Sequence, residues 1–143
     1  MLNKMIASFG LMMLACCAPS APAGAITVEN ALISAPVTGG EVAAAYFVLQ
    51  NKGAADQLVG ASTTIATAVE LHETMNDAGM MRMHHLPSVE LPAGGAVEFA
   101  PGGKHIMLIG LKTDLVDRSQ QPITLTFAQA APITVMFTVT APQ

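Results

Sequence analysis

The chain has 143 residues, of which 52% are hydrophobic and 11% charged, and six basic against ten acidic residues give a formal net charge of −4. This length accommodates one domain and excludes a multidomain enzyme, and the apolar composition is that of a packed protein, not of a disordered segment. The few basic residues are scattered along the chain, which excludes the clustered Lys and Arg of a nucleic-acid-binding surface.

The N-terminal segment has the composition of a secretory leader. Lys4 precedes an apolar run at residues 5–15, and small residues and prolines follow through Ala25. The run is shorter than the roughly 20 apolar residues of a membrane-spanning helix, so a signal peptide is the better interpretation. We therefore expect residues 1–25 to be a signal peptide and residues 26–143 to form the exported domain in the periplasm.

The only two cysteines of the chain, Cys16 and Cys17, lie in this leader. Leu14-Ala15-Cys16 resembles a bacterial lipobox, so a cut before Cys16 is an alternative that would leave a lipid anchor as the only membrane contact. In either case the domain at residues 26–143 has no thiol. This excludes a disulfide scaffold, a thiolate zinc site, a cysteine nucleophile and a blue-copper electron carrier.

Turn residues recur at short intervals along the mature chain and leave little space for helices. Apolar and polar residues alternate most clearly at the end of the chain, which is typical of half-buried strands. The predicted strands are residues 26–33, 42–50, 57–61, 68–73, 80–85, 96–100, 105–111, 123–127 and 133–140. About nine short strands without intervening helices predict an all-β sandwich or small barrel.

Histidine and methionine gather in the middle of this domain. All four histidines lie between His72 and His105, and five of the six methionines of the mature chain fall in nearly the same window, at positions 75, 80, 81, 83 and 107. A hydrophobic core would use Leu, Ile and Val, with Met as an occasional gap filler. The cluster therefore indicates a metal site.

Side chains alternate between the two faces of a strand, and this sorts the candidate ligands. His105 and Met107 share one face of their predicted strand. Met83 shares a face with Met81 and His85, and His72 faces away from Leu71. Three strands could thus bring together two imidazoles and two thioethers, those of His72, Met83, His105 and Met107.

Two imidazoles and two thioethers without a carboxylate favour one Cu(I) ion per chain over Zn²⁺ or Ca²⁺, because uncharged ligands compensate a dication poorly. Thioethers also bind without losing a proton and do not form disulfides. The residues therefore favour a Cu(I)-binding site.

The spacing of the four residues, H-x10-M-x21-H-x-M, resembles the signature of the periplasmic copper chaperones of the PCuAC family. Residues 69–75, 91–95, 101–112 and 123–127 also look like that family. The resemblance implies a cupredoxin-like β-barrel or sandwich that carries Cu(I). It further implies delivery to the dinuclear copper centre of cytochrome c oxidase, in its subunit II, or to an assembly factor.

Two other functions stay open at this point. A periplasmic copper storage or resistance protein would use the same four ligands. A zinc hydrolase would use His72, His105 and either His84 or His85, with Glu73 as the base, although the chain lacks an HExxH arrangement.

Five further residues of the window are outside the predicted ligand set. We expect His84 and His85 to be exposed, since two adjacent strand residues cannot both face one metal. Met75, Met80 and Met81 could shield the ion, bind it transiently during transfer or cover apolar surface.

Overall fold

The structure is a computed structural model that describes residues 25–37 and 39–142. The predicted leader, including the lipobox cysteine Cys16, lies outside the described residues except for Ala25. Among the described residues, no helix is long and apolar enough to span a membrane.

The described residues form ten strands. They are β1 (Ile26–Ser34), β2 (Val42–Asn51), β3 (Asp56–Ser62), β4 (Ala66–Asp77), β5 (Met80–His85), β6 (Val89–Leu91), β7 (Ala96–Phe99), β8 (Lys104–Leu111), β9 (Gln120–Phe127) and β10 (Ile133–Thr140). The predicted all-β fold class is confirmed. One strand, β6, was not predicted, because it has only three residues and lies between a bend at Pro87 and Pro92.

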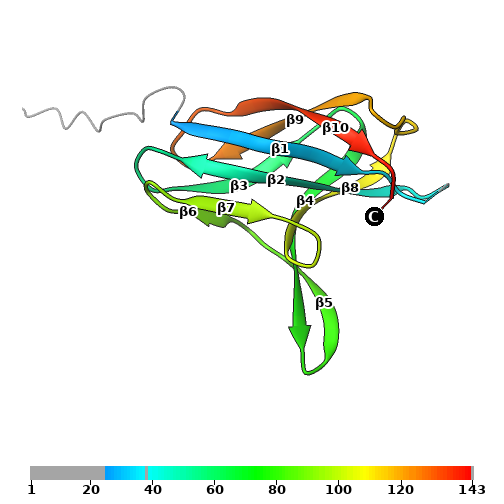
Figure 1. Cartoon of the computed structure of the whole chain (residues 1–143), viewed down its shortest axis with the longest axis horizontal. Helices are drawn as coiled ribbons and strands as arrows, with labels where there is room; N and C mark the ends of the chain where they lie inside the picture. The colour runs from blue at the N-terminus through cyan, green and yellow to red at the C-terminus, as the bar shows by residue number, and fades with distance from the viewer. Residues whose placement is uncertain (1–24, 38, 143) are drawn as a thin grey trace, which may run out of the picture.

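The strands follow the order β5-β4-β8-β2-β1-β10-β9-β3-β6, with β7 paired to β2 (Figure 1). The sheet does not close into a barrel and forms a sandwich-like fold. β1 connects its two halves, because β1 pairs antiparallel with β2 and parallel with β10. The pairing of β1 with β2 shifts register between Glu29 and Leu32, and Asn30 there has a φ of 53°.

The core lies between the two halves and is built by alternate residues of the strands. Ile123, Leu125 and Phe127 of β9 are buried, whereas Thr124 and Thr126 between them are not. Phe47 of β2 stacks on Phe99 at a centroid distance of 4.3 Å and meets Phe137 edge to face at 5.5 Å. This apolar core fixes β2 and β8, whose outward faces position the candidate site.

The β4–β5 hairpin extends away from the body of the sandwich (Figure 1). The first part of β4 pairs with β8, as far as Glu73, and its last part continues with β5 alone. Two residues, Ala78 and Gly79, connect the strands with φ angles of 52° and 86°. Positive φ at both positions is the geometry of a type I′ turn, and the Gly79 N–H also donates to Asn76 Oδ1 at 2.9 Å. This turn sets the register of the hairpin.

Candidate metal centre

Strand β8 contributes two of the four predicted ligands, His105 and Met107. It lies between β4 and β2, and its alternate residues Ile106 and Leu108 are buried in the core. His105 is only 4% exposed, although it lies on the outward face. Its Nδ1 lies 3.1 Å from the carbonyl oxygen of Gly103. When the Nδ1–H donates to this oxygen, the Nε2 lone pair is available to a metal ion.

Strand β4 contributes His72, which is paired in register with His105. The two ring centroids are 5.9 Å apart. His72 Nε2 lies 2.8 Å from Oε2 of Glu70, and the His72 side chain is 14% exposed. In the part of the chain that the structure describes, nothing hydrogen-bonds to His72 Nδ1, which is buried.

This unpartnered nitrogen tests whether the residues fit a metal. A buried polar atom without a hydrogen bond is costly, so it needs a partner that the protein side chains do not supply. If Nε2–H donates to Glu70, the Nδ1 of a neutral ring carries a lone pair. A histidine ligand whose other ring nitrogen is held by a carboxylate is a recurrent arrangement in metal sites. His72 therefore has the hydrogen bonding of a metal ligand.

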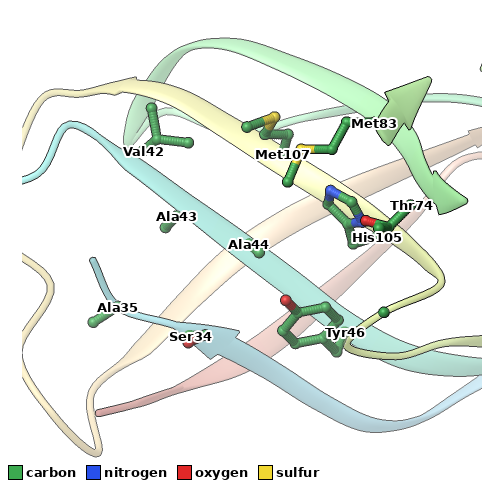
Figure 2. Close-up of a pocket in the computed structure, with 11 residues that line it drawn as sticks. Ser34, Ala35, Val42, Ala43, Ala44, Tyr46, Thr74, Met83, His105 and Met107 are labelled. Carbon is green, nitrogen blue, oxygen red and sulfur yellow. The ribbon is translucent and has the colours of Figure 1, made fainter. Parts of the chain in front are cut away.

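A cavity of about 340 Å³ brings together the other three predicted ligands, Met83, His105 and Met107. Figure 2 shows the two methionine side chains and the imidazole turned toward the same hollow. Ala44 of β2, paired with Met107, also lines it, so small side chains leave room beside the sulfur. His72 is not among the lining residues and lies beside the cavity, next to His105.

The cavity has an uncharged lining. Tyr46 lines it with its ring centroid 6.4 Å from that of His105, and burial raises the pKa of its phenol above the ordinary value of 10.0. The phenol is therefore neutral at physiological pH. Among the described residues, no carboxylate lines this cavity. An uncharged lining agrees with a preference for a soft ion of low charge.

No group of three or more His, Cys, Asp or Glu side chains is placed to hold a metal ion within residues 25–37 and 39–142. The three-ligand group that a zinc hydrolase would need is therefore not found in this range. A site built on His72 and His105 depends on the thioethers to complete its coordination.

Met83 comes from the hairpin and is 59% exposed. It is opposite Thr74 in register, on the same face of the hairpin as His72. The cavity thus gathers Met83 of β5 with His105 and Met107 of β8, while His72 of β4 lies next to His105 outside its lining. That these four residues bind a metal stays a prediction.

The contact of His85 with His72 was not predicted from the sequence. Both His84 and His85 are exposed, as predicted, but His85 is opposite His72 in register. Their rings meet edge to face at a centroid distance of 5.8 Å. The Leu86 N–H donates to the Leu71 carbonyl, so the neighbouring pair His72–His85 is a non-hydrogen-bonded pair, in which side chains lie closest.

Glu70 was also missed, although a signal for it existed. It stands two positions before His72, and residues two apart on a strand share a face. The same rule that grouped His105 with Met107 therefore places a carboxylate beside His72.

The sequence is similar to a protein family and to two relatives. The family model described as "Putative lipoprotein LpqE-like" matches residues 26–139. A protein of Leifsonia xyli subsp. xyli named "Putative lipoprotein Lxx21020" is 34% identical over 115 residues, which cover 79% of this chain and 68% of the relative. "Uncharacterized protein RP573" of Rickettsia prowazekii is 37% identical over 86 residues, which cover 59% of this chain and 48% of the relative.

Several solved structures share the fold. The copper-bound PCuAC domain from PmoF2 is 27% identical with a TM-score of 0.72, covering 83% of this chain and 95% of that domain. The solution structure of CuI-DR1885 from Deinococcus radiodurans is 33% identical with a TM-score of 0.64, covering 85% of this chain and 83% of the other. The matched family model spans nearly the whole described domain, and the chain belongs to the LpqE-like family.

Proposed function

We propose that this protein is a periplasmic copper chaperone that binds one Cu(I) ion through His72, Met83, His105 and Met107 and performs no catalysis. The observation that carries the proposal is the buried, unpartnered Nδ1 of His72, 5.9 Å ring to ring from His105. A Cu(I) ion supplies the missing partner of this nitrogen. The likeness to a copper-bound PCuAC domain and to a Cu(I)-bound protein of the same fold supports the choice of metal.

The donor set explains why Cu(I) is the cargo. Thioether sulfur is a soft ligand that prefers Cu(I), and imidazole nitrogen binds copper well. Two neutral imidazoles and two thioethers leave the net charge of the ion at +1, which an uncharged cavity accommodates more readily than +2. Binding requires no deprotonation of a thiol, so the site works where thiols would be oxidised.

The exposure of Met83 supports transfer over storage. A ligand on a projecting hairpin can hold the ion at the surface of the protein, where an acceptor ligand can enter as the bonds to β4 and β8 break. A storage or resistance protein would use the same residues but gains nothing from an exposed ligand. We propose the dinuclear copper centre in subunit II of cytochrome c oxidase, or an assembly factor for it, as the acceptor.

An anaerobic Cu(I) titration against a competing chelator tests the binding site. We expect the wild-type protein to bind one equivalent. Met83→Ala and Met107→Ala each remove a direct ligand, so each should lose more than the roughly 10- to 100-fold in affinity that loss of an outer-shell partner costs. Met136→Ala on β10 is the matched control, because Met136 is also an exposed strand methionine, at 49%, but lies outside the cavity.

Unchanged affinity in both Met83→Ala and Met107→Ala would contradict the proposed ligand set. The acceptor is tested separately, by mixing copper-loaded protein with copper-free oxidase subunit II and following copper by mass spectrometry. Retention of copper by the loaded protein would favour the storage alternative. Intact mass of the exported protein would establish whether Cys16 carries a lipid.

A further inference from the structure

The three methionines whose role the sequence left open lie on different faces of the β4–β5 hairpin. Met81 is paired with Asn76, two positions from the Thr74–Met83 pair and on the same face. Met80 and Met75 are paired with Asp77 and Arg82 and lie on the opposite face. Of the three, Met81 alone therefore shares the face of Met83 and His72.

Met83 lines the cavity, and Met81 lies two residues closer to the end of the hairpin on the same face. Residues two apart on a strand point the same way and are separated by about 7 Å along the chain. Methionine has three rotatable side-chain bonds, so two sulfurs at this spacing can converge on one ion. Both side chains are mostly solvent-exposed, at 62% for Met81 and 59% for Met83.

The position of Met81 on the projecting hairpin makes it accessible to an acceptor. It lies close to the Ala78–Gly79 turn, at the end of the hairpin that extends away from the body (Figure 1). His105, by contrast, is almost fully buried. An incoming protein would therefore meet Met81 before it reaches the ligands on β8.

We propose that Met81 is a transfer ligand, which binds Cu(I) together with Met83 while the ion passes between the cavity and an acceptor. This inference rests on the proposed function. In the transfer the Cu–N and Cu–S bonds to β4 and β8 break as a Cu–S bond to Met81 and a bond to the acceptor form. The copper stays Cu(I), and the thioethers neither gain nor lose a proton or an electron.

A transfer ligand acts on the rate of copper release and leaves the equilibrium affinity unchanged. The test uses the full exported chain loaded anaerobically with Cu(I), which is mixed with excess bathocuproine disulfonate and followed by absorbance. Met81→Leu keeps an apolar side chain of similar size and removes only the sulfur. Met80→Leu is the matched control, because Met80 is the adjacent residue and is 60% exposed on the opposite face.

We expect Met81→Leu to bind Cu(I) as tightly as the wild type and to transfer it about tenfold more slowly, which corresponds to 1.36 kcal/mol of lost transition-state stabilisation. Met80→Leu should match the wild type in both measurements. A wild-type transfer rate in Met81→Leu, or equal slowing by both variants, would overturn the role of Met81. A wild-type protein that binds no Cu(I) would instead overturn the proposed function, so the two failures are distinguishable.

Discussion

Strands β8 and β5 both contribute to the candidate site, but they are held in the molecule very differently. β8 is paired on both sides, with β4 and β2, and buries Ile106 and Leu108 in the core. β5 ends the strand order, is paired with β4, and has every residue exposed. The candidate site therefore has one part on β8, which the core holds in place, and another part on β5, which only the β4–β5 hairpin supports.

This difference would allow the proposed site to bind Cu(I) and still release it. His105 is held by a hydrogen bond to the Gly103 carbonyl and by burial, so its nitrogen is oriented before copper arrives. Preorganised ligands lose less conformational entropy on binding. Met83 is exposed on β5, so its sulfur lies where an acceptor can reach a bound ion. Strand β4, which carries His72, pairs with both β8 and β5 and so connects the two parts of the site.

Leu108→Ala should have the largest effect, because it removes a fully buried side chain from the strand that the core holds in place. A buried Leu→Ala substitution costs about 2–5 kcal/mol of unfolding free energy, through lost burial and the cavity left behind. Urea unfolding of the copper-free protein measures it. A loss below about 0.5 kcal/mol, as for a surface change, would refute the view of β8 as part of a rigid core.

Asp56→Asn tests whether the scaffold can be weakened far from the site. The Asp56 carboxylate on β3 accepts backbone N–H bonds from Gln57 at 2.7 Å, Gln129 at 2.9 Å and Ala130 at 2.8 Å. Burial raises the pKa of this carboxyl. The backbone hydrogen bonds together lower the pKa by more than burial raises it, so the net pKa falls below the ordinary value of 3.8.

The lowered pKa fixes the sign of the pH dependence. The folded state favours the carboxylate, so its stabilisation is complete above the unfolded pKa and is lost as pH falls through the folded pKa. Asp56→Asn should therefore cost about 1–3 kcal/mol near neutral pH. The gap from the wild type should shrink below about pH 4, and Cu(I) affinity should stay unchanged. A matching loss of affinity would mean that the site depends on the whole scaffold.

Glu70→Ala tests the connecting strand. Without the carboxylate, the His72 ring loses the hydrogen bond that orients it, and loss of such outer partners costs about 10- to 100-fold in metal affinity. Glu73→Ala is the matched control, because Glu73 is on the opposite face of β4, where its carboxylate binds Lys104 Nζ at 2.9 Å. Competition titration with a chelator measures both, and equal affinities in the two variants would exclude an orienting role for Glu70.

Met83→Ala should have the smallest effect on stability. Its side chain is mostly exposed on a strand that buries nothing, so the copper-free protein should lose less than about 0.5 kcal/mol of unfolding free energy. Together with a large loss of Cu(I) affinity, this result would separate binding from folding on β5. A destabilisation comparable to that of Leu108→Ala would show that the hairpin is part of the core.

The alternation of apolar and polar residues predicted most strands and their faces, because one buried face per strand leaves a clear period of two. It placed Ile123 and Leu125 on the buried face of their strand and grouped His105 with Met107 on one face of β8. It predicted 68–73 for a strand that runs from Ala66 to Asp77, because the end of β4 is not buried and shows no apolar alternation.

The hairpin register could not be predicted, and with it the contact between His72 and His85. The Asn76–Gly79 segment allows turns of different lengths, and the observed turn places Ala78 at a positive φ that alanine seldom adopts. Burial of His105 also depends on three-dimensional neighbours, Tyr46 and Thr74 among the residues around the cavity, which its own strand does not specify. The four-residue ligand set stays a prediction that the geometry favours.

The solvent exposure of Met83 also makes its sulfur accessible to peroxide. Oxidation would convert the thioether to a sulfoxide, which is polar and chiral and no longer a soft sulfur donor. The half-buried Met107 is better shielded. Oxidative damage would therefore impair copper exchange before it impaired folding, and methionine sulfoxide reductases could reverse it without resynthesis of the protein.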